Sequence, residues 1–491
     1  MKKFVVAAVI LTGVAFSQTD LHAQYNVPEI LEQAESAEAP VVITLEQALE
    51  IALSENLSVK VADMEIQRVE YAKKGSYASL YPQIDMSGSY QRTIKKQVMY
   101  MDFPMSSLMG GGAGTEMPDT GAGEGAGAGT GADSSAGSSS NDGIEMGRWN
   151  SWATGVSASM PLVNAQLWQS LKISGLDVEL AVEKARSSRL DMVTQVKNAY
   201  FATLLAKEAF DVYKQVYENA LQNLAETQKK YDAQKVSDMD LLRAKTTVAN
   251  AIPNVFNAEG SVILALWQLK AVLGVDLDMN LDVAGKLEDW SQHMFYDIHQ
   301  HDSATLDHNT TMKQLAIQAE MLAETIKVQQ YANLPSLAMS FNYSLNAMTN
   351  DFKFSEYRWT PYSFVAFSLN IPIFAGGKRY QQIRQAKNQY EQVKLQTVNT
   401  ERQLKISIRQ SLNTMETNMK SYYAAKDAVA AAQKGYDIVE KSYQVGRSTL
   451  IEVNDAQLSL TQAQLAQSQA VYNFLTAKSQ LEQTLGQDFI Q

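Results

Sequence analysis

The chain of 491 residues contains no cysteine. This absence excludes disulfides, thiolate metal sites, a cysteine nucleophile and a lipidated N-terminal cysteine. The sequence also lacks a nucleophile elbow, a phosphate-binding loop and an HExxH zinc motif. His299 and His301 have the spacing of neighbours on one side of a strand, but two histidines alone are weak evidence for a metal site. We therefore expect no enzyme activity, no metal site and no cofactor.

Long apolar runs are also missing. Past the N-terminus, no stretch reaches about eighteen uncharged apolar residues, so no transmembrane helix is expected. A lysine pair and a short apolar run from Phe4 to Phe16 open the chain, which is the pattern of a secretory signal. We predict a signal peptide at 1–23, followed by an extended segment at 24–43. The formal net charge of -11 argues against nucleic acid as a partner.

The sequence contains an internal repeat. A shift of 212 residues aligns 231–274 with 443–486 without a gap. Both copies carry small residues at heptad spacing, which predicts a seam where a second helix packs closely. The seam residues are Ala244, Ala251, Ala258 and Ala265 in the first copy and Ala456, Ala463, Ala470 and Ala477 in the second.

A second shift, of 253 residues, places Asn56 on Asn309 and Pro82 on Pro335. Each half then has the order helix, strand, strand, very long helix, return helix. The repeats are predicted at 44–274 and 309–491, joined by a linker at 275–308. The expected segments are strands at about 81–100, 149–161, 335–347 and 361–373, long helices at 164–230 and 378–441, and return helices at 237–273 and 449–485.

One insertion separates the two strands of the first half. Residues 104–147 are rich in glycine and serine, and their central part has almost no apolar side chains. Such a segment buries too little surface to offset its ordering entropy, so we expect a disordered loop.

The strand segments alternate strictly between apolar residues and small polar ones. Serine, asparagine, glycine and alanine on the polar face suit the inner wall of a wide membrane barrel better than the charged exterior of a soluble sandwich. The predicted lipid-facing residues are Trp152, Val156, Met160, Met339, Phe341, Tyr343, Val365, Phe367 and Leu369. Trp152, Tyr343, Trp359 and Tyr362 are candidates for the aromatic girdle. Four strands cannot close a membrane barrel, so the chain is expected to oligomerise.

The helical segments are too long for a globular core. Between 164 and 230 there is no proline and only one glycine, and 378–441 has the same character. At about 1.5 Å per residue, each helix reaches on the order of 100 Å. Pro253 lies inside the first return helix and is expected to kink it.

These features together resemble the TolC family of outer-membrane efflux proteins. The resemblance rests on the doubled arrangement and on three stretches, "TLEQALEIALSEN" at 44–56, "LPSLAMSFNY" at 334–343 and "SYQVGRSTLIEVNDAQLSLTQAQ" at 442–464. It implies a mainly helical protein with a transmembrane β-barrel. Three chains would form a twelve-stranded barrel in the outer membrane, continuous with an α-helical barrel in the periplasm. The implied partners are two further copies of the chain, a periplasmic adaptor, an inner-membrane pump and outer-membrane lipid.

The resemblance also assigns roles to the turns between the long and return helices, which would form the periplasmic tip. It implies a gate of Glu452, Asp455, Tyr443 and Asp240. It implies adaptor contacts at Lys235, Val236, Ser237, Gly446, Arg447 and Ser448. Glu452 and Asp455 are three residues apart and share a helix face, so a trimer would bring three such pairs near one axis. Ordinary solvated carboxylates are the competing interpretation.

The resulting hypothesis is a passive exit duct of an efflux or type I secretion system. The main alternative is a periplasmic coiled-coil scaffold without a pore. High salt would release such a scaffold from membranes, whereas a barrel would need detergent.

Overall fold

The computed structural model describes residues 40–99, 144–294 and 306–487. The predicted signal peptide, most of 24–43, most of the glycine-rich segment and the pair His299 and His301 lie outside these ranges. The chain divides into two compact units. A sheet unit comprises 77–165 and 333–374, and a helical unit comprises the rest of the chain.

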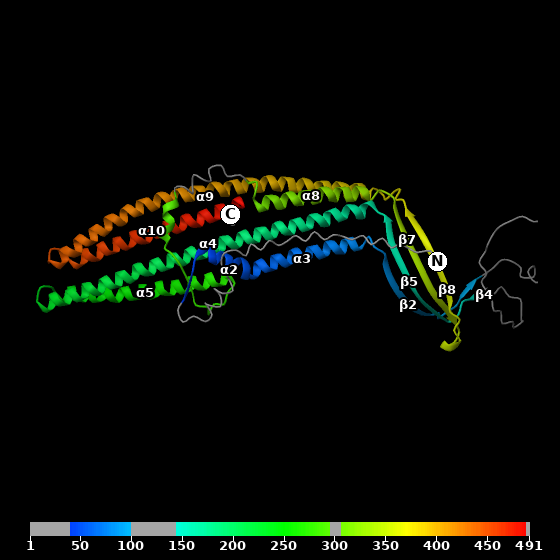
Figure 1. The fold of residues 1–491 in the computed structure, drawn as a ribbon, viewed down its shortest axis with the longest axis horizontal. Helices are drawn as coiled ribbons and strands as arrows, with labels where there is room; N and C mark the ends of the chain where they lie inside the picture. The colour runs from blue at the N-terminus through cyan, green and yellow to red at the C-terminus, as the bar shows by residue number, and fades with distance from the viewer. Residues whose placement is uncertain (1–39, 100–143, 295–305, 488–491) are drawn as a thin grey trace, which may run out of the picture. The chain divides into compact units, whose positions relative to one another are not determined.

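The sheet unit is built on four antiparallel strands in the order β2, β5, β7, β8. Their bounds are β2 Gln83–Arg92, β5 Asn150–Val163, β7 Ser336–Thr349 and β8 Thr360–Asn370. β7 lies close against the backbone of Gly155 on β5, because a Cβ there would lie 2.7 Å from the carbonyl oxygen of Tyr343. Figure 1 shows the four strands running side by side.

The first half departs from the expected strand at 81–100. β2 ends at Arg92, and a bend at 93–96 precedes a separate strand, β3 Gln97–Met99. β3 pairs antiparallel with β4 Ile144–Met146. The prediction of disorder up to residue 147 was therefore wrong at its C-terminal end, because Ile144 and Met146 continue the alternation and form a ladder.

The register gives the sheet one apolar face. Residues directly opposite in an antiparallel pair lie on the same face. Met160 opposes Met339, which in turn opposes Phe367. By the same pairing and alternation, all nine residues predicted to face lipid share this face. Their contact with lipid itself stays a prediction.

Tyr362 does not belong to that face. It opposes Ser344, whose neighbours across the sheet include Gly155 and Ser87, so it stands on the polar face. The girdle assignment of Tyr362 was wrong because the residue is three positions from Val365, and an odd separation reverses the direction of a strand side chain.

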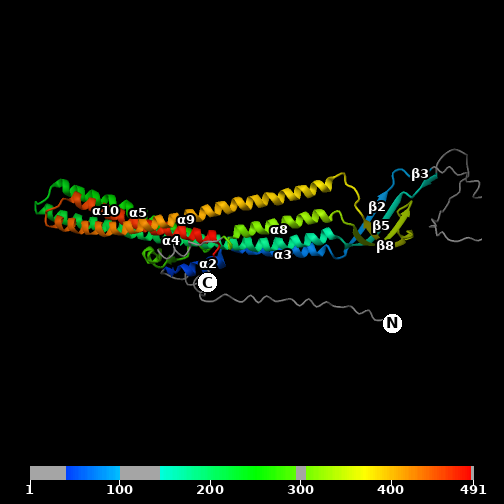
Figure 2. The same ribbon diagram turned by 90° about the horizontal axis from the view of Figure 1, so that it is seen from above.

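The helical unit consists of long helices and a small parallel ladder. Figure 2 shows the helices running along one another. They are α2 Leu45–Glu55, α3 Leu57–Ala78, α4 Ala165–Asp232, α5 Asp238–Leu273, α8 Thr310–Tyr331, α9 Lys378–Gln444 and α10 Leu450–Leu485. α5 continues as a helix through Pro253. Among the described residues, no helix combines the length and the apolar character needed to cross a membrane.

The alanine seam is part of the packed interior. All four seam residues of α5 are buried. In α10, Ala470 and Ala477 are buried, and Ala456 and Ala463 are partly covered. The small side chains therefore occupy the contact faces of the return helices, as the heptad spacing predicts.

The main core lies where β1 Val41–Ile43 pairs in parallel with β6 Leu281–Val283. Tyr200 of α4 donates its hydroxyl to the carbonyl of Ala284 at 2.7 Å, and burial raises its pKa to about 12. Lys207 donates to both carboxylate oxygens of Asp282 at 2.9 Å. The segment expected as a linker thus contains β6, α6 Leu287–Trp290 and the 3-10 turn η2 Ser291–His293, and it is fastened to α4.

Candidate functional site: the paired helix tips

Two turns lie at the same end of the helical unit, as Figures 1 and 2 show. One joins α4 to α5 and the other joins α9 to α10. Gln234 has a φ of 61° and Gly446 a φ of 77°. Lys235 donates its backbone N–H to the carbonyl of Lys230, and Arg447 does the same to Ser442, each at 2.8 Å. The turns are therefore copies of one helix-ending motif with a left-handed residue at the same place.

Both return helices start with a capping box. Ser237 accepts from the N–H of Asp240, whose carboxylate accepts from the backbone and the hydroxyl of Ser237. Thr449 accepts from the N–H of Glu452, whose carboxylate accepts from the N–H of Thr449 at 2.8 Å. Two of the predicted gate carboxylates are thus engaged in starting a helix. Both capping boxes could have been predicted from the sequence, since in each stretch a hydroxyl residue is followed three positions later by an acidic residue.

Asp455 differs from Glu452. It lies less than one turn further along α10 and is exposed. Within the described residues, its carboxylate has no hydrogen bond or ion pair. Of the predicted gate residues, Asp455 therefore offers the least engaged negative charge.

Tyr443 is buried between two helices, with 4% of its surface exposed. Its hydroxyl lies 2.6 Å from Oγ1 of Thr227 on α4. The single hydroxyl proton of Thr227 goes to the carbonyl of Asn223, so Tyr443 is the donor in this contact. Burial raises the pKa of Tyr443, which keeps the phenol protonated.

Lys230 completes this contact between α4 and α9. Its ammonium group lies 3.8 Å from the centre of the Tyr443 ring and donates to the Tyr443 carbonyl. Burial lowers the pKa of Lys230. The predicted gate residue Tyr443 thus fastens α9 to α4 just before the turn, a cation–π and hydrogen-bond arrangement that the sequence pattern did not reveal.

Further polar contacts join the pair of α4 and α5 to the pair of α9 and α10. Asn219 of α4 donates to Gln457 of α10 at 2.8 Å, and Asn454 of α10 donates to Thr247 of α5 at 3.2 Å. Close by, burial and the neighbouring Glu226 raise the pKa of Glu440. These side chains were missed because polar residues on long helices give no periodic signal.

The two turns themselves are accessible. The six predicted adaptor contacts are exposed or partly exposed. Two apolar side chains beside them were missed, Val445 with 70% and Met239 with 58% of the surface exposed. Val445 and Met239 therefore add apolar surface to the two accessible turns. Within the described ranges, no group of three or more potential metal ligands occurs.

The sequence of this chain is similar to those of known proteins. The family model described as "Outer membrane efflux protein" matches residues 127–275 and 303–487. "Outer membrane protein TolC" of Escherichia coli (strain K12) is 22% identical over 348 residues, which are 69% of this chain and 70% of that protein. Because the family model spans more than half of the chain, it establishes family membership.

Solved structures agree on the fold. The Campylobacter jejuni CmeC outer membrane channel has a TM-score of 0.64 at 16% identity, covering 90% of this chain and 85% of that one. The outer membrane protein VceC of Vibrio cholerae has a TM-score of 0.65 at 15% identity, covering 90% and 96%. The chain belongs to the outer membrane efflux protein family.

Proposed function

We propose that three copies of this chain close a twelve-stranded barrel and form a passive conduit that a periplasmic adaptor and an inner-membrane pump open. The chain is an exit duct of the outer membrane that extends into the periplasm, of the kind that serves efflux or type I secretion. The trimer, the partners and the residue roles are the parts that belong to the proposal. No catalytic role is proposed for any residue.

The open sheet is the observation that supports the proposed trimer. β2 and β8 are the two edges of the four-stranded sheet, and neither edge is paired along its length within the described residues. In a membrane, each unpaired backbone group costs several kcal/mol. β2 and β8 run in opposite directions, so β8 of one copy can continue the antiparallel order onto β2 of the next. Repetition of this contact around a closed ring removes every edge.

Disulfide crosslinking tests this contact, because the chain has no cysteine of its own. Ser87→Cys on β2 is combined in turn with Phe364→Cys, Ala366→Cys or Ser368→Cys on β8, all on the polar face. The two edges of one sheet are three strand spacings apart, about 14 Å, which is too far for an internal disulfide.

In at least one register, oxidation should give covalent products that end at three chains in a denaturing gel. Ser87→Cys alone is the matched control and should stay monomeric. Monomers in all three registers, or a ladder that continues past three chains, would contradict the closed trimer.

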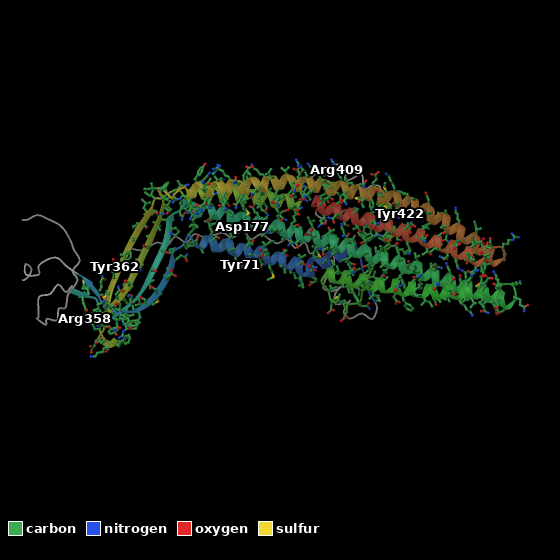
Figure 3. All side chains as sticks on the ribbon, turned by 180° about the vertical axis from the view of Figure 1, so that it is seen from behind. Tyr71, Asp177, Arg358, Tyr362, Arg409 and Tyr422 are labelled. Atoms are coloured by element: carbon green, nitrogen blue, oxygen red, sulfur yellow. The ribbon has the colours of Figure 1, made fainter. Side chains whose placement is uncertain are left out.

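The exposed turns support the adaptor contact. Lys235 and Arg447 are equivalent basic residues on the two turns, and both are exposed. Lys235→Glu with Arg447→Glu should abolish export while leaving the amount of protein in the outer membrane unchanged. The control is Arg402→Glu with Arg409→Glu, two exposed positions on α9 away from the turns; Figure 3 labels Arg409. Normal export by the tip variant would remove these residues from the adaptor surface.

The scaffold alternative makes the opposite prediction in fractionation. Family membership favours the duct. Extraction of the chain from membranes by high salt without detergent would favour the scaffold.

A further inference from the structure

The connection between β7 and β8 folds back onto the sheet, at the end where β2 also stops. It contains the 3-10 turn η3 Phe354–Glu356. The carbonyl oxygen of Asp351 accepts from Thr349 Oγ1 at 2.8 Å, Tyr357 Oη at 2.9 Å and Asn150 Nδ2 at 3.3 Å. These bonds hold the connection in one place relative to the strands.

Aromatic rings of this connection cover the end of the apolar face. Tyr90 and Trp152 are directly opposite on β2 and β5, with ring centres 4.3 Å apart. Phe354 stands edge-on to Trp152 at 5.2 Å, and Phe352 is 6.3 Å from Tyr90. Phe352 and Phe354 still expose 51% and 58% of their surfaces. Trp152, predicted to face lipid, is therefore partly covered by the chain's own rings.

Basic residues are frequent on the segments that carry this aromatic cluster. Arg92 is two residues beyond Tyr90 on the same face, and its guanidinium lies 5.8 Å from the ring centre of Phe352. The ammonium of Lys96 lies 4.9 Å from the ring centre of Trp149. The described residues of this end carry six basic side chains, Arg92, Lys95, Lys96, Arg148, Lys353 and Arg358, and three acidic ones, Glu145, Asp351 and Glu356. A local excess of positive charge thus occurs in a chain with a net charge of -11.

Four of these cations are free to meet a ligand. Arg92, Lys95, Lys353 and Arg358 are exposed, and the described residues give none of them a carboxylate partner. Arg358 follows the buried Tyr357 and is labelled in Figure 3. By contrast, Lys96 lies 3.9 Å from Glu145, and Arg148 donates to the carbonyl of Met348 at 2.9 Å. We name Arg92, Lys353 and Arg358, with the rings of Phe352 and Phe354, the rim surface.

We propose that the rim surface binds a phosphorylated glycolipid of the outer leaflet of the outer membrane. The acyl chains would lie along the apolar face of the sheet, and the rings would occupy the boundary between hydrocarbon and headgroups. Guanidinium groups match phosphate oxygens through paired hydrogen bonds, and the lysine adds a point charge. At this end of the sheet, the apolar face is followed by aromatic rings and then by unpaired cations. A phosphorylated glycolipid has its parts in the matching order, with acyl chains, a headgroup boundary and phosphates.

The proposal rests on the proposed function, because the helices must be periplasmic for this end of the strands to face outward. A phosphorylated glycolipid is favoured over an ordinary phospholipid because several exposed cations lie on the segments that border one end of the apolar face. One phospholipid phosphate would leave most of them without a partner.

The test uses the purified full chain in phosphatidylcholine nanodiscs that contain a bisphosphorylated glucosamine lipid or the same lipid after enzymatic removal of its phosphates. Native mass spectrometry counts glycolipid retained per chain. The test variant carries Arg92→Gln, Lys353→Gln and Arg358→Gln. The control carries Arg402→Gln, Arg409→Gln and Lys434→Gln, three exposed positions on α9.

The wild type and the control should retain the phosphorylated lipid, and the test variant should bind it about tenfold more weakly, as expected for the loss of three exposed ion pairs. The dephosphorylated lipid should bind the wild type as weakly as the phosphorylated lipid binds the test variant. Equal retention by wild type and test variant would overturn the proposal. Equal retention of phosphatidylglycerol would overturn the choice of a glycolipid.

One further outcome would mean that the rim surface binds another segment of the same chain. Residues 110–143 contain five carboxylates and no basic residue. Retention that occurs only after deletion of 110–143 would mean that these carboxylates compete for the cations, and it would overturn the proposal. Failure of the chain to enter nanodiscs at all would contradict the proposed function, whereas normal insertion without lipid preference would contradict only this inference.

Discussion

The side-chain amide of Asn309 donates a 2.6 Å hydrogen bond to the backbone carbonyl of Thr484, 175 residues later. Asn56 makes the same bond to Val272 at 2.7 Å in the first repeat. In each repeat, one asparagine thus begins a helix and closes the last turn of the return helix. The partner turn ends at a glycine with positive φ, Gly274 or Gly486.

Asn309→Ala should destabilise the protein by about 1–3 kcal/mol, because it leaves a buried carbonyl unpaired and removes a helix cap. Gly486→Ala should also destabilise it, since a Cβ there would clash with the carbonyl oxygen of His308. Thermal unfolding in detergent provides the measurement. Asn388→Ala, at an exposed position of α9, is the control. Equal midpoints for Asn309→Ala and the control would refute the structural role.

Gln234→Gly should stabilise the protein by about 0.5–1 kcal/mol, because glycine adopts positive φ without the cost that a side chain imposes. Gly446→Gln is the reciprocal change and should destabilise by a similar amount. A Cβ at Gly446 would meet nothing within 4 Å, so the reciprocal change tests φ alone. Denaturant midpoints of both variants provide the comparison. A neutral Gln234→Gly would mean that the first turn relaxes to another conformation.

Tyr443→Phe should lower the free energy of unfolding by about 1 kcal/mol, because Thr227 loses the buried donor that joins α4 to α9. If this contact helps to keep the tip closed, single-channel conductance in a planar bilayer should rise. Tyr423→Phe, at an exposed position of the same helix, serves as the matched control. Unchanged conductance with a lowered unfolding midpoint would limit Tyr443 to a structural role.

Glu452→Gln with Asp455→Asn should raise conductance and weaken block by cations. The predicted reason is that the variant removes negative charge from the tip without changing side-chain size. Glutamine still completes a capping box, so the helix start is preserved. Glu452→Ala separates the two roles, since it also removes the cap and should lower the unfolding midpoint by about 1 kcal/mol. Identical conductance and cation block in the charge-neutral variant would remove both residues from the gate.

The long elements were predictable because their signals are periodic. Segments without proline or repeated glycine became α4 and α9, and strict alternation placed nine apolar residues on one face. Short elements gave no such signal. β1 and β6 have three residues each, and only their pairing across the chain makes them strands.

The candidate site was less predictable, because its contacts join residues far apart in the sequence. Tyr443 was assigned to the gate by resemblance, yet its burial depends on Thr227 and Lys230 of another helix. The capping roles of Asp240 and Glu452 were local and could have been predicted from the spacing alone. The covering of Trp152 by Phe354 depends on how one connection folds back, which no local pattern specifies.

The proposed trimer requires that identical neighbours complete the open sheet of each chain. Native mass spectrometry of the detergent-purified particle tests it most directly, because the number of chains follows from the mass. We predict a particle of three chains that requires detergent to stay in solution. A monomer that is soluble without detergent would contradict it.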